Sequence, residues 1–323
     1  MKSLDSGRYA VSISVAAALL SGCSGWQAAP PNAATISGSQ SGPASQSWVN
    51  PSASRGDLVY LAIYGEVFVY SYPGGKHVST LTGVKKPVAL CSDVSGNVWV
   101  IESDSHSHSR LLKYAHDGSK PIASLRLNDR ADACSVDAGT GSLAVGTLNS
   151  NVAVWANGQG RPTLYSTAAF FKEVRTISYD GKGDLYMRSF VSDKSGAWLP
   201  KGTSTVMQFH ITKLGSYGWD GRYFAIGPGN GFTEPLTIYK LHGGRGKVVG
   251  SVSLKNCAPG YEPSFSIAGS ELAVSCGIDE TNSLNYYKYP KGGNPIKTVG
   301  PGATGSVAIS VAPSKNDGIN FLP

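Results

Sequence analysis

The sequence predicts an all-β protein, a six-bladed β-propeller that follows a signal peptide and a disordered tether. Composition is the first observation behind this prediction: 40 glycines and 18 prolines among 323 residues favour many short strands joined by tight turns. The second is an internal repeat, because an aromatic residue followed by a turn recurs every 41 to 48 residues. This period is typical of a four-stranded propeller blade.

The first 22 residues are typical of an export signal. Lys2 and Arg8 flank its start, and residues 10–20 form an apolar run too short to span a bilayer permanently. The run ends in Leu20-Ser21-Gly22-Cys23, which resembles the lipobox of bacterial lipoproteins. This resemblance implies that Cys23 is lipidated and that the protein is anchored to a membrane of the cell envelope, the outer membrane or the cell surface. An ordinary secretory signal that contains a cysteine is the alternative.

The residues after the signal divide into three parts. Residues 23–55 are rich in Ser, Gly and Pro, with almost no charge, and too few large apolar groups to fold, so they are expected to form a tether. Residues 56–313 contain the repeats and form the predicted propeller. Residues 314–323 are expected to be a short C-terminal tail.

The repeat has one aromatic residue in each predicted blade, placed before a turn rich in Pro or Gly. The six aromatic residues are Tyr70, Tyr114, Trp155, Trp198, Tyr239 and Tyr287. Their recurrence at one position of the blade favours a packing role over stacking on a carbohydrate.

Between these aromatic residues, two apolar strands flank a turn that usually contains Asp or Gly. The predicted strand pairs are 90–93 with 97–100, 134–137 with 142–145, 177–180 with 184–187, 217–220 with 222–226, and 265–268 with 271–275. The first strand of each pair is expected to line the propeller axis and the second to lie behind it. A fourth, outer strand follows each aromatic turn, as at 77–81 and 121–125.

The first and last parts of the repeat complement each other. The first blade opens at Leu58 with a second-type strand and lacks its innermost strand, while residues 306–312 form an innermost strand with no blade after it. We expect the C-terminal strand to pair beside residues 58–63 and close the ring, which removes exposed strand edges.

The segment Pro87-Val88-Ala89-Leu90-Cys91-Ser92-Asp93-Val94-Ser95-Gly96-Asn97-Val98-Trp99-Val100 resembles the repeat signature of the NHL and gluconolactonase-like propeller superfamily. The resemblance covers residues 58–313 as architecture. Gluconolactonase-like enzymes hold a metal with Glu, Asn and Asp side chains, but no residue of this chain matches that set. The resemblance therefore implies a fold and carries over no lactonase activity.

The four cysteines after Cys23 are an even number in an exported chain, which favours disulfides. Cys91 and Cys134 lie in the innermost strands of successive blades. They differ by one position relative to the turn Asp, which points them to opposite strand faces unless a bulge intervenes. Cys257 and Cys276 lie near one rim and form the second candidate pair. Free buried thiols are the alternative.

The loops that enter the innermost strands are the expected ligand face of the propeller. Their candidate ligand residues are Arg130, Asp132, Phe171, Glu173, Arg175, Tyr261 and Glu262. Asp132, Glu173 and Glu262 are the candidate ligands of a divalent cation, since hard cations need several oxygens. Lys172 and Arg175 oppose a cation there and favour salt-bridged rim residues, so no cofactor is predicted.

The predicted function is a membrane-anchored, extracytoplasmic, non-catalytic binding or scaffold module that takes a protein, glycan or peptide on one propeller face. A metal-dependent hydrolase or lactonase of the gluconolactonase type is the alternative. No catalytic set can be named: Asp104, His106 and His108 share one polar loop, whereas triad residues normally come from distant segments. The net charge of +7 is scattered, so nucleic acid is not expected as a partner, and the protein is expected to be a monomer.

Overall fold

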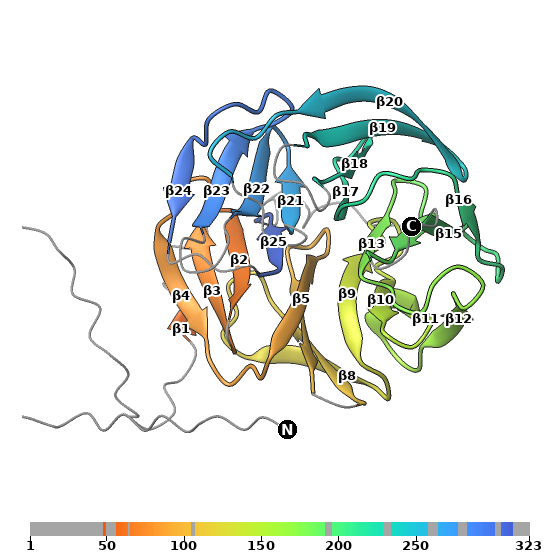
Figure 1. Ribbon diagram of the computed structural model, residues 1–323. Coiled ribbons are helices and arrows are strands. Elements are labelled where there is room, and N and C mark those ends of the chain that lie inside the picture. Colours follow the sequence, from red (N-terminus) through yellow and green to blue (C-terminus); the bar gives the residue numbers. More distant parts are fainter. Residues whose placement is uncertain are drawn as a thin grey trace, which may run out of the picture. The chain divides into compact units, whose positions relative to one another are not determined.

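The computed structural model describes residues 48–49, 56–63, 65–104, 107–190, 196–228, 234–257, 264–276, 283–300 and 305–312. The signal segment, Cys23 and the predicted tail lie outside these residues. The described residues form six antiparallel sheets arranged as blades around an axis (Figure 1). They also contain one turn of 3-10 helix, Ala156–Gly158. The predicted six-bladed propeller is confirmed.

Each blade is built from four strands that succeed one another from the axis outward. Blade 1 contains β25 (Val307–Ser310), β2 (Leu58–Ile63), β3 (Glu66–Ser71) and β4 (His77–Leu81). Blade 2 contains β5 (Pro87–Ser92), β6 (Val98–Ser103), β7 (Ser109–Tyr114) and β8 (Pro121–Leu127). Blade 3 contains β9 (Ala131–Val136), β10 (Leu143–Thr147), β11 (Asn151–Trp155) and β12 (Thr163–Ser166).

The last three blades repeat this order. Blade 4 contains β13 (Thr176–Tyr179), β14 (Leu185–Arg188), β15 (Gly196–Leu199) and β16 (Met207–Phe209). Blade 5 contains β17 (Tyr217–Trp219), β18 (Phe224–Ile226), β19 (Leu236–His242) and β20 (Arg245–Val252). Blade 6 contains β21 (Phe265–Ala268), β22 (Glu271–Cys276), β23 (Ser283–Lys288) and β24 (Lys297–Val299).

The C-terminal strand closes the ring. β25 pairs antiparallel with β2, with Leu58 opposite Ser310 and Leu61 opposite Val307. All four residues of β25 and all six of β2 are buried. The predicted closure is confirmed, and the strand that completes blade 1 comes from the far end of the chain.

Blade 1 carries a fifth strand that the sequence did not predict. The backbone of β1 (Trp48–Val49) pairs with β4, with Trp48 opposite Thr80 and Val49 opposite Ser79. These two residues lie inside the segment predicted to be a tether. An outer strand offers unpaired N–H and C=O groups to any extended segment nearby, and β1 uses those of β4.

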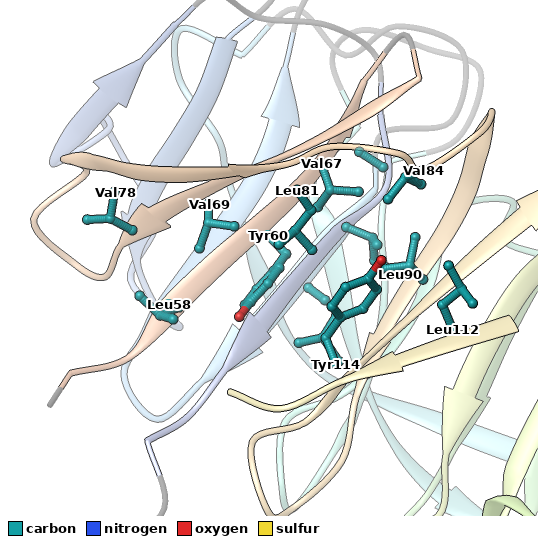
Figure 2. Close-up of a cluster of buried hydrophobic side chains, with 14 residues drawn as sticks. Leu58, Tyr60, Val67, Val69, Val78, Leu81, Val84, Leu90, Leu112 and Tyr114 are labelled. Atoms are coloured by element: carbon teal, nitrogen blue, oxygen red, sulfur yellow. The ribbon is translucent and has the colours of Figure 1, made fainter. Parts of the chain in front are cut away.

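The hydrophobic core lies between neighbouring blades. Figure 2 shows Tyr60 and Leu81 of blade 1 in one cluster with Leu90, Leu112 and Tyr114 of blade 2. Five of the six repeated aromatic residues are buried, and the sixth, Trp198, is half-buried and stacks on Tyr186 with 5.8 Å between ring centroids. The repeated aromatics are packing residues.

The Asp residues of the repeat shape the turns between first and second strands. Asp93 accepts the backbone N–H groups of Ser95 and Asn97, and Asp180 accepts those of Lys182 and Asp184. Asp137 and Asp220 accept backbone N–H groups two residues further on in the same way. A carboxylate that bonds its own turn explains why the repeat carries Asp at this position.

Both predicted disulfides are present. Cys91 and Cys134 join blades 2 and 3 with a Cα–Cα distance of 5.8 Å, and Cys257 and Cys276 are 5.0 Å apart. The expectation that opposite strand faces hinder the first pair is wrong, because neighbouring blades stack face to face. A cysteine on the forward face of blade 2 meets one on the rear face of blade 3, so the one-position offset favours the pair.

Within the described part of the chain, we find no helix of sufficient length and hydrophobicity to cross a membrane.

Candidate functional site

A polar channel runs along the propeller axis. Its cavity measures about 540 Å³ and is lined by the innermost strands of all six blades. We call the end where the chain enters these strands the loop face. The opposite end, which carries the turns between first and second strands and between third and fourth strands, is the turn face. In an antiparallel four-stranded blade both of these turns lie at the same end.

Hydroxyl side chains join the innermost strands across the blade junctions. Each of these strands pairs with its blade on one edge only and leaves N–H groups free on the other. The N–H of Leu90 donates to Ser306 Oγ at 2.8 Å, and that of Tyr179 to Ser135 Oγ at 3.1 Å. The other contacts of this kind join Tyr217 N–H to Thr176 Oγ1 (2.8 Å), Val307 N–H to Ser264 Oγ (3.0 Å) and Ile309 N–H to Ser266 Oγ (3.2 Å).

The two remaining junctions are joined differently. The Cys91–Cys134 disulfide lies between blades 2 and 3 and lines the channel. Between blades 5 and 6 the ring of Phe265 packs against Gly218, where a Cβ would lie 2.7 Å from it. The hydroxyls of the channel wall thus hold neighbouring strands together. Charged side chains are found at the end of the channel instead.

An ion cluster lies at the loop face of the channel. Arg175 contacts Asp132 at 3.2 Å and Glu173 at 2.9 Å, and the side chains of Arg175 and Asp132 line the cavity. Burial raises the pKa of the Asp132 carboxyl above its usual range, although the guanidinium of Arg175 acts in the opposite direction. All three side chains remain partly exposed, so solvent and a ligand both have access to them.

The other predicted ligand residues occupy different places. Arg130 is exposed on the loop that leads into β9, close enough to Asp132 to lower the pKa of its carboxyl. Phe171 is buried against the core between blades 3 and 4, so it packs the loop and offers little surface to a ligand. Tyr261 and Glu262 lie outside the described residues.

The guanidinium of Arg175 occupies the place that a cation would need in this cluster. Two of the three candidate metal ligands, Asp132 and Glu173, both face the guanidinium of Arg175. A cation bound between them would meet that positive charge at close range. In the parts of the chain that the structure describes, no three His, Cys, Asp or Glu side chains are grouped to hold a metal.

The polar loop 103–109 does not form a hydrolytic triad in its described residues. His108 Nδ1 lies 2.8 Å from Ser107 Oγ and 3.6 Å from Asp104 Oδ2, so one ring nitrogen faces both groups. A triad needs the acid on one nitrogen and the nucleophile on the other. Asp104 accepts the N–H groups of Ser107 and His108 and so shapes its own loop.

Two features near the loop face were missed by the sequence analysis. Phe190, which follows β14, lines the cavity. Arg188 is buried at 1% exposure, and its Nη1 donates to the carbonyl of Ile211 at 3.0 Å. A charged residue at the end of a short strand gives no sequence signal of burial.

Comparisons with known proteins support the fold alone. No protein-family model matches the chain, and no curated protein matches it by sequence. A chain from the structure of a nidogen/laminin complex is similar over 80% of this chain and 100% of its own length, with 12% identity and a TM-score of 0.57. The Cps50 (Swd1) β-propeller domain of Myceliophteria thermophila is similar over 84% of this chain and 91% of its own, with 11% identity and a TM-score of 0.50.

The fold is too widely shared to indicate a function. In all, 1140 chains of solved structures match this one. Propellers host unrelated functions on one architecture, so function has to be argued from the channel and its loop face.

Proposed function

We propose that the protein is a membrane-anchored, extracytoplasmic, non-catalytic binding module that holds a protein, glycan or peptide ligand at its loop face. The observation that carries this proposal is the ion cluster of Asp132, Glu173 and Arg175, which lies partly exposed at the end of a channel of about 540 Å³. A pocket with a few convergent polar groups is the usual form of a binding site.

The arrangement of the cluster favours binding over catalysis. Arg175 already pairs with both carboxylates, which leaves neither of them free to act as a base or as a ligand of a metal. The neighbouring hydroxyls of the channel wall accept backbone N–H groups of the next blade. A tight, stoichiometric divalent cation in the purified protein would contradict the non-catalytic proposal in favour of a metal-dependent hydrolase.

The proposed anchor is a lipid on Cys23. The support for it is the Leu20-Ser21-Gly22-Cys23 motif after an apolar run, together with two disulfides, which persist in oxidising compartments. The variant Cys23→Ser is expected to leave the membrane fraction after a high-salt wash, whereas the wild-type protein stays in it. A variant that remains in the washed membranes would contradict the anchor.

The loop face is tested by capture from envelope extract. Wild-type protein and two charge-reversed variants are immobilised: Arg130→Glu at the loop face and Lys240→Glu on the outer part of blade 5, both at exposed residues. A ligand of the loop face is retained by the wild type and by Lys240→Glu and is lost by Arg130→Glu. If all three proteins retain the same molecules, the loop face is not the binding surface.

A further inference from the structure

Every blade carries one basic residue in the same turn. These residues stand in or directly beside the turn between the third and fourth strands, and they are Lys76, Lys120, Arg161, Lys201, Arg245 and Lys291. Four of them follow the repeated aromatic residue of their blade by six positions, as Lys76 follows Tyr70. The basic residue is therefore part of the repeat, although no packing or turn geometry requires a positive charge there.

We call these six residues the basic ring, and their side chains are available for contacts with a partner. All six residues are exposed. Among the described residues none of the six side chains has an ion pair or a hydrogen bond, and the contacts of Lys76 and Lys201 are made by their backbone N–H groups. Only one acidic residue, Asp117, stands in the six turns themselves.

Three carboxylates of the turn face have partners of their own. Asp93 binds Lys113 at 2.8 Å in addition to its own turn, and Glu271 binds Lys288 at 3.3 Å. Asp220 accepts the hydroxyl of Tyr289 at 2.6 Å. These three acidic groups thus stabilise the fold, whereas the side chains of the basic ring have no ion pair or hydrogen bond among the described residues.

The positions of the six turns define the shape of that partner. The blades are arranged around one axis (Figure 1), so equivalent turns lie on one circle around it, at one end of the blades. An extended polymer meets the turns of a few neighbouring blades at a time, whereas a plane meets all six together. We propose that the turn face docks flat on an anionic lipid bilayer through the basic ring. The loop face then points away from the membrane.

This inference rests on the proposed function for one point only, the nearness of a bilayer that a lipid on Cys23 provides. The attraction itself is electrostatic. Basic residues near an anionic bilayer each strengthen binding about fivefold, and the effect weakens within a Debye length of about 10 Å at 0.1 M salt. Docking would orient the loop face toward soluble ligands.

The test uses the full chain with Cys23→Ser, so that no lipid anchor contributes. Binding is measured by co-sedimentation with vesicles of phosphatidylcholine containing about a third phosphatidylglycerol, and with phosphatidylcholine alone, at low and high salt. We expect binding to the anionic vesicles at low salt, and its loss at high salt or without phosphatidylglycerol.

Two variants of equal net charge locate the surface. The ring variant carries Lys76→Gln, Lys120→Gln, Arg161→Gln and Arg245→Gln, and the control carries Lys85→Gln, Lys86→Gln, Arg126→Gln and Lys172→Gln at exposed positions of the loop face. The ring variant is expected to lose about a hundredfold or more in partitioning, and the control less than about fivefold. Melting curves establish that both variants are folded.

Three outcomes would overturn the inference. The parent chain does not bind anionic vesicles, the two variants lose vesicle partitioning equally, or the parent chain binds dextran sulfate but no vesicle. A failure of the proposed function can be distinguished from a failure of this inference. In that case the wild-type protein carries no lipid on Cys23, or its loop face captures no molecule, while the basic ring still binds anionic vesicles.

Discussion

His116 Nδ1 lies 2.6 Å from Ser310 Oγ, and the Nε2 of the same ring lies 3.0 Å from the carbonyl oxygen of Gly56. His116 belongs to blade 2, Ser310 ends β25, and Gly56 stands two residues before β2. The Ser310 hydroxyl donates in turn to the carbonyl of Gly96, also in blade 2. The two ends of the propeller therefore meet on one buried side chain of the neighbouring blade.

Replacing this histidine should weaken ring closure. His116→Ala is expected to lower the free energy of unfolding by about 1 to 3 kcal/mol, because it removes two hydrogen bonds of a buried side chain. His242→Ala, at an exposed position, should change it by less than about 0.5 kcal/mol. Urea unfolding measures both. Equal midpoints for the two variants would mean that the His116 contacts contribute nothing to stability.

Removing the closing strand should unfold the protein. A chain that ends at Gly305 loses β25, in which Val307 and Ile309 are buried; each large apolar side chain contributes roughly 1.5 to 3 kcal/mol. It also exposes the inner edge of β2. A chain that ends at Ala312 keeps the strand and serves as the control. Circular dichroism and size-exclusion chromatography compare them, and a monomeric, cooperatively folded product of the shorter chain would refute the closure.

The two disulfides should stabilise the propeller to different extents. Cys91–Cys134 spans 43 residues and Cys257–Cys276 spans 19. Loop-closure entropy predicts losses of about 4 and about 3 kcal/mol when each pair is replaced by serine. Urea unfolding of the two double variants under oxidising conditions tests the order. Reducing agent should destabilise the wild-type protein, and an unchanged melting temperature would speak against both bridges.

Asp132 should make stability depend on pH. Its pKa is raised chiefly by burial, so the folded state holds the proton more tightly than the unfolded chain does. The ionised carboxyl therefore weakens the fold above the usual Asp range, and this penalty disappears as the pH falls below that range. Asp132→Asn is expected to raise the free energy of unfolding at neutral pH and to have no effect in strong acid. A variant that is less stable at neutral pH would show that the Arg175 pair outweighs burial.

The repeat made the architecture predictable from the sequence. Tyr70 and Tyr114 mark the period because every blade places an aromatic residue at the same position, and the missing first strand of blade 1 required a partner at the other end of the chain. Cys91 and Cys134 show where such reasoning was incomplete. Two residues within one sheet contact each other when they lie on the same face of that sheet. Two residues of neighbouring blades contact each other when they lie on opposite faces, because the blades stack face to face.

The details of the site were less predictable. Ser135 and Thr176 resemble any polar strand residues, and their role depends on the backbone N–H groups that the next blade brings near. The sequence predicted Arg175 at the loop face, as a positive charge that disfavours binding of a cation. Glu173 is two residues from Arg175 in the same loop, but the contact with Asp132 depends on how that loop meets β9, which spacing along the chain does not reveal.

Site-specific photo-crosslinking in cells tests the loop face most directly. Benzoylphenylalanine replaces Phe190, which lines the channel, and in a second protein it replaces Leu164, which is 58% exposed on the outer strand of blade 3. A ligand at the loop face predicts a light-dependent adduct from position 190 and none from position 164. The contradicting result is an adduct from position 164 and none from position 190, in proteins that are folded and membrane-anchored. That result would rule out binding at the loop face.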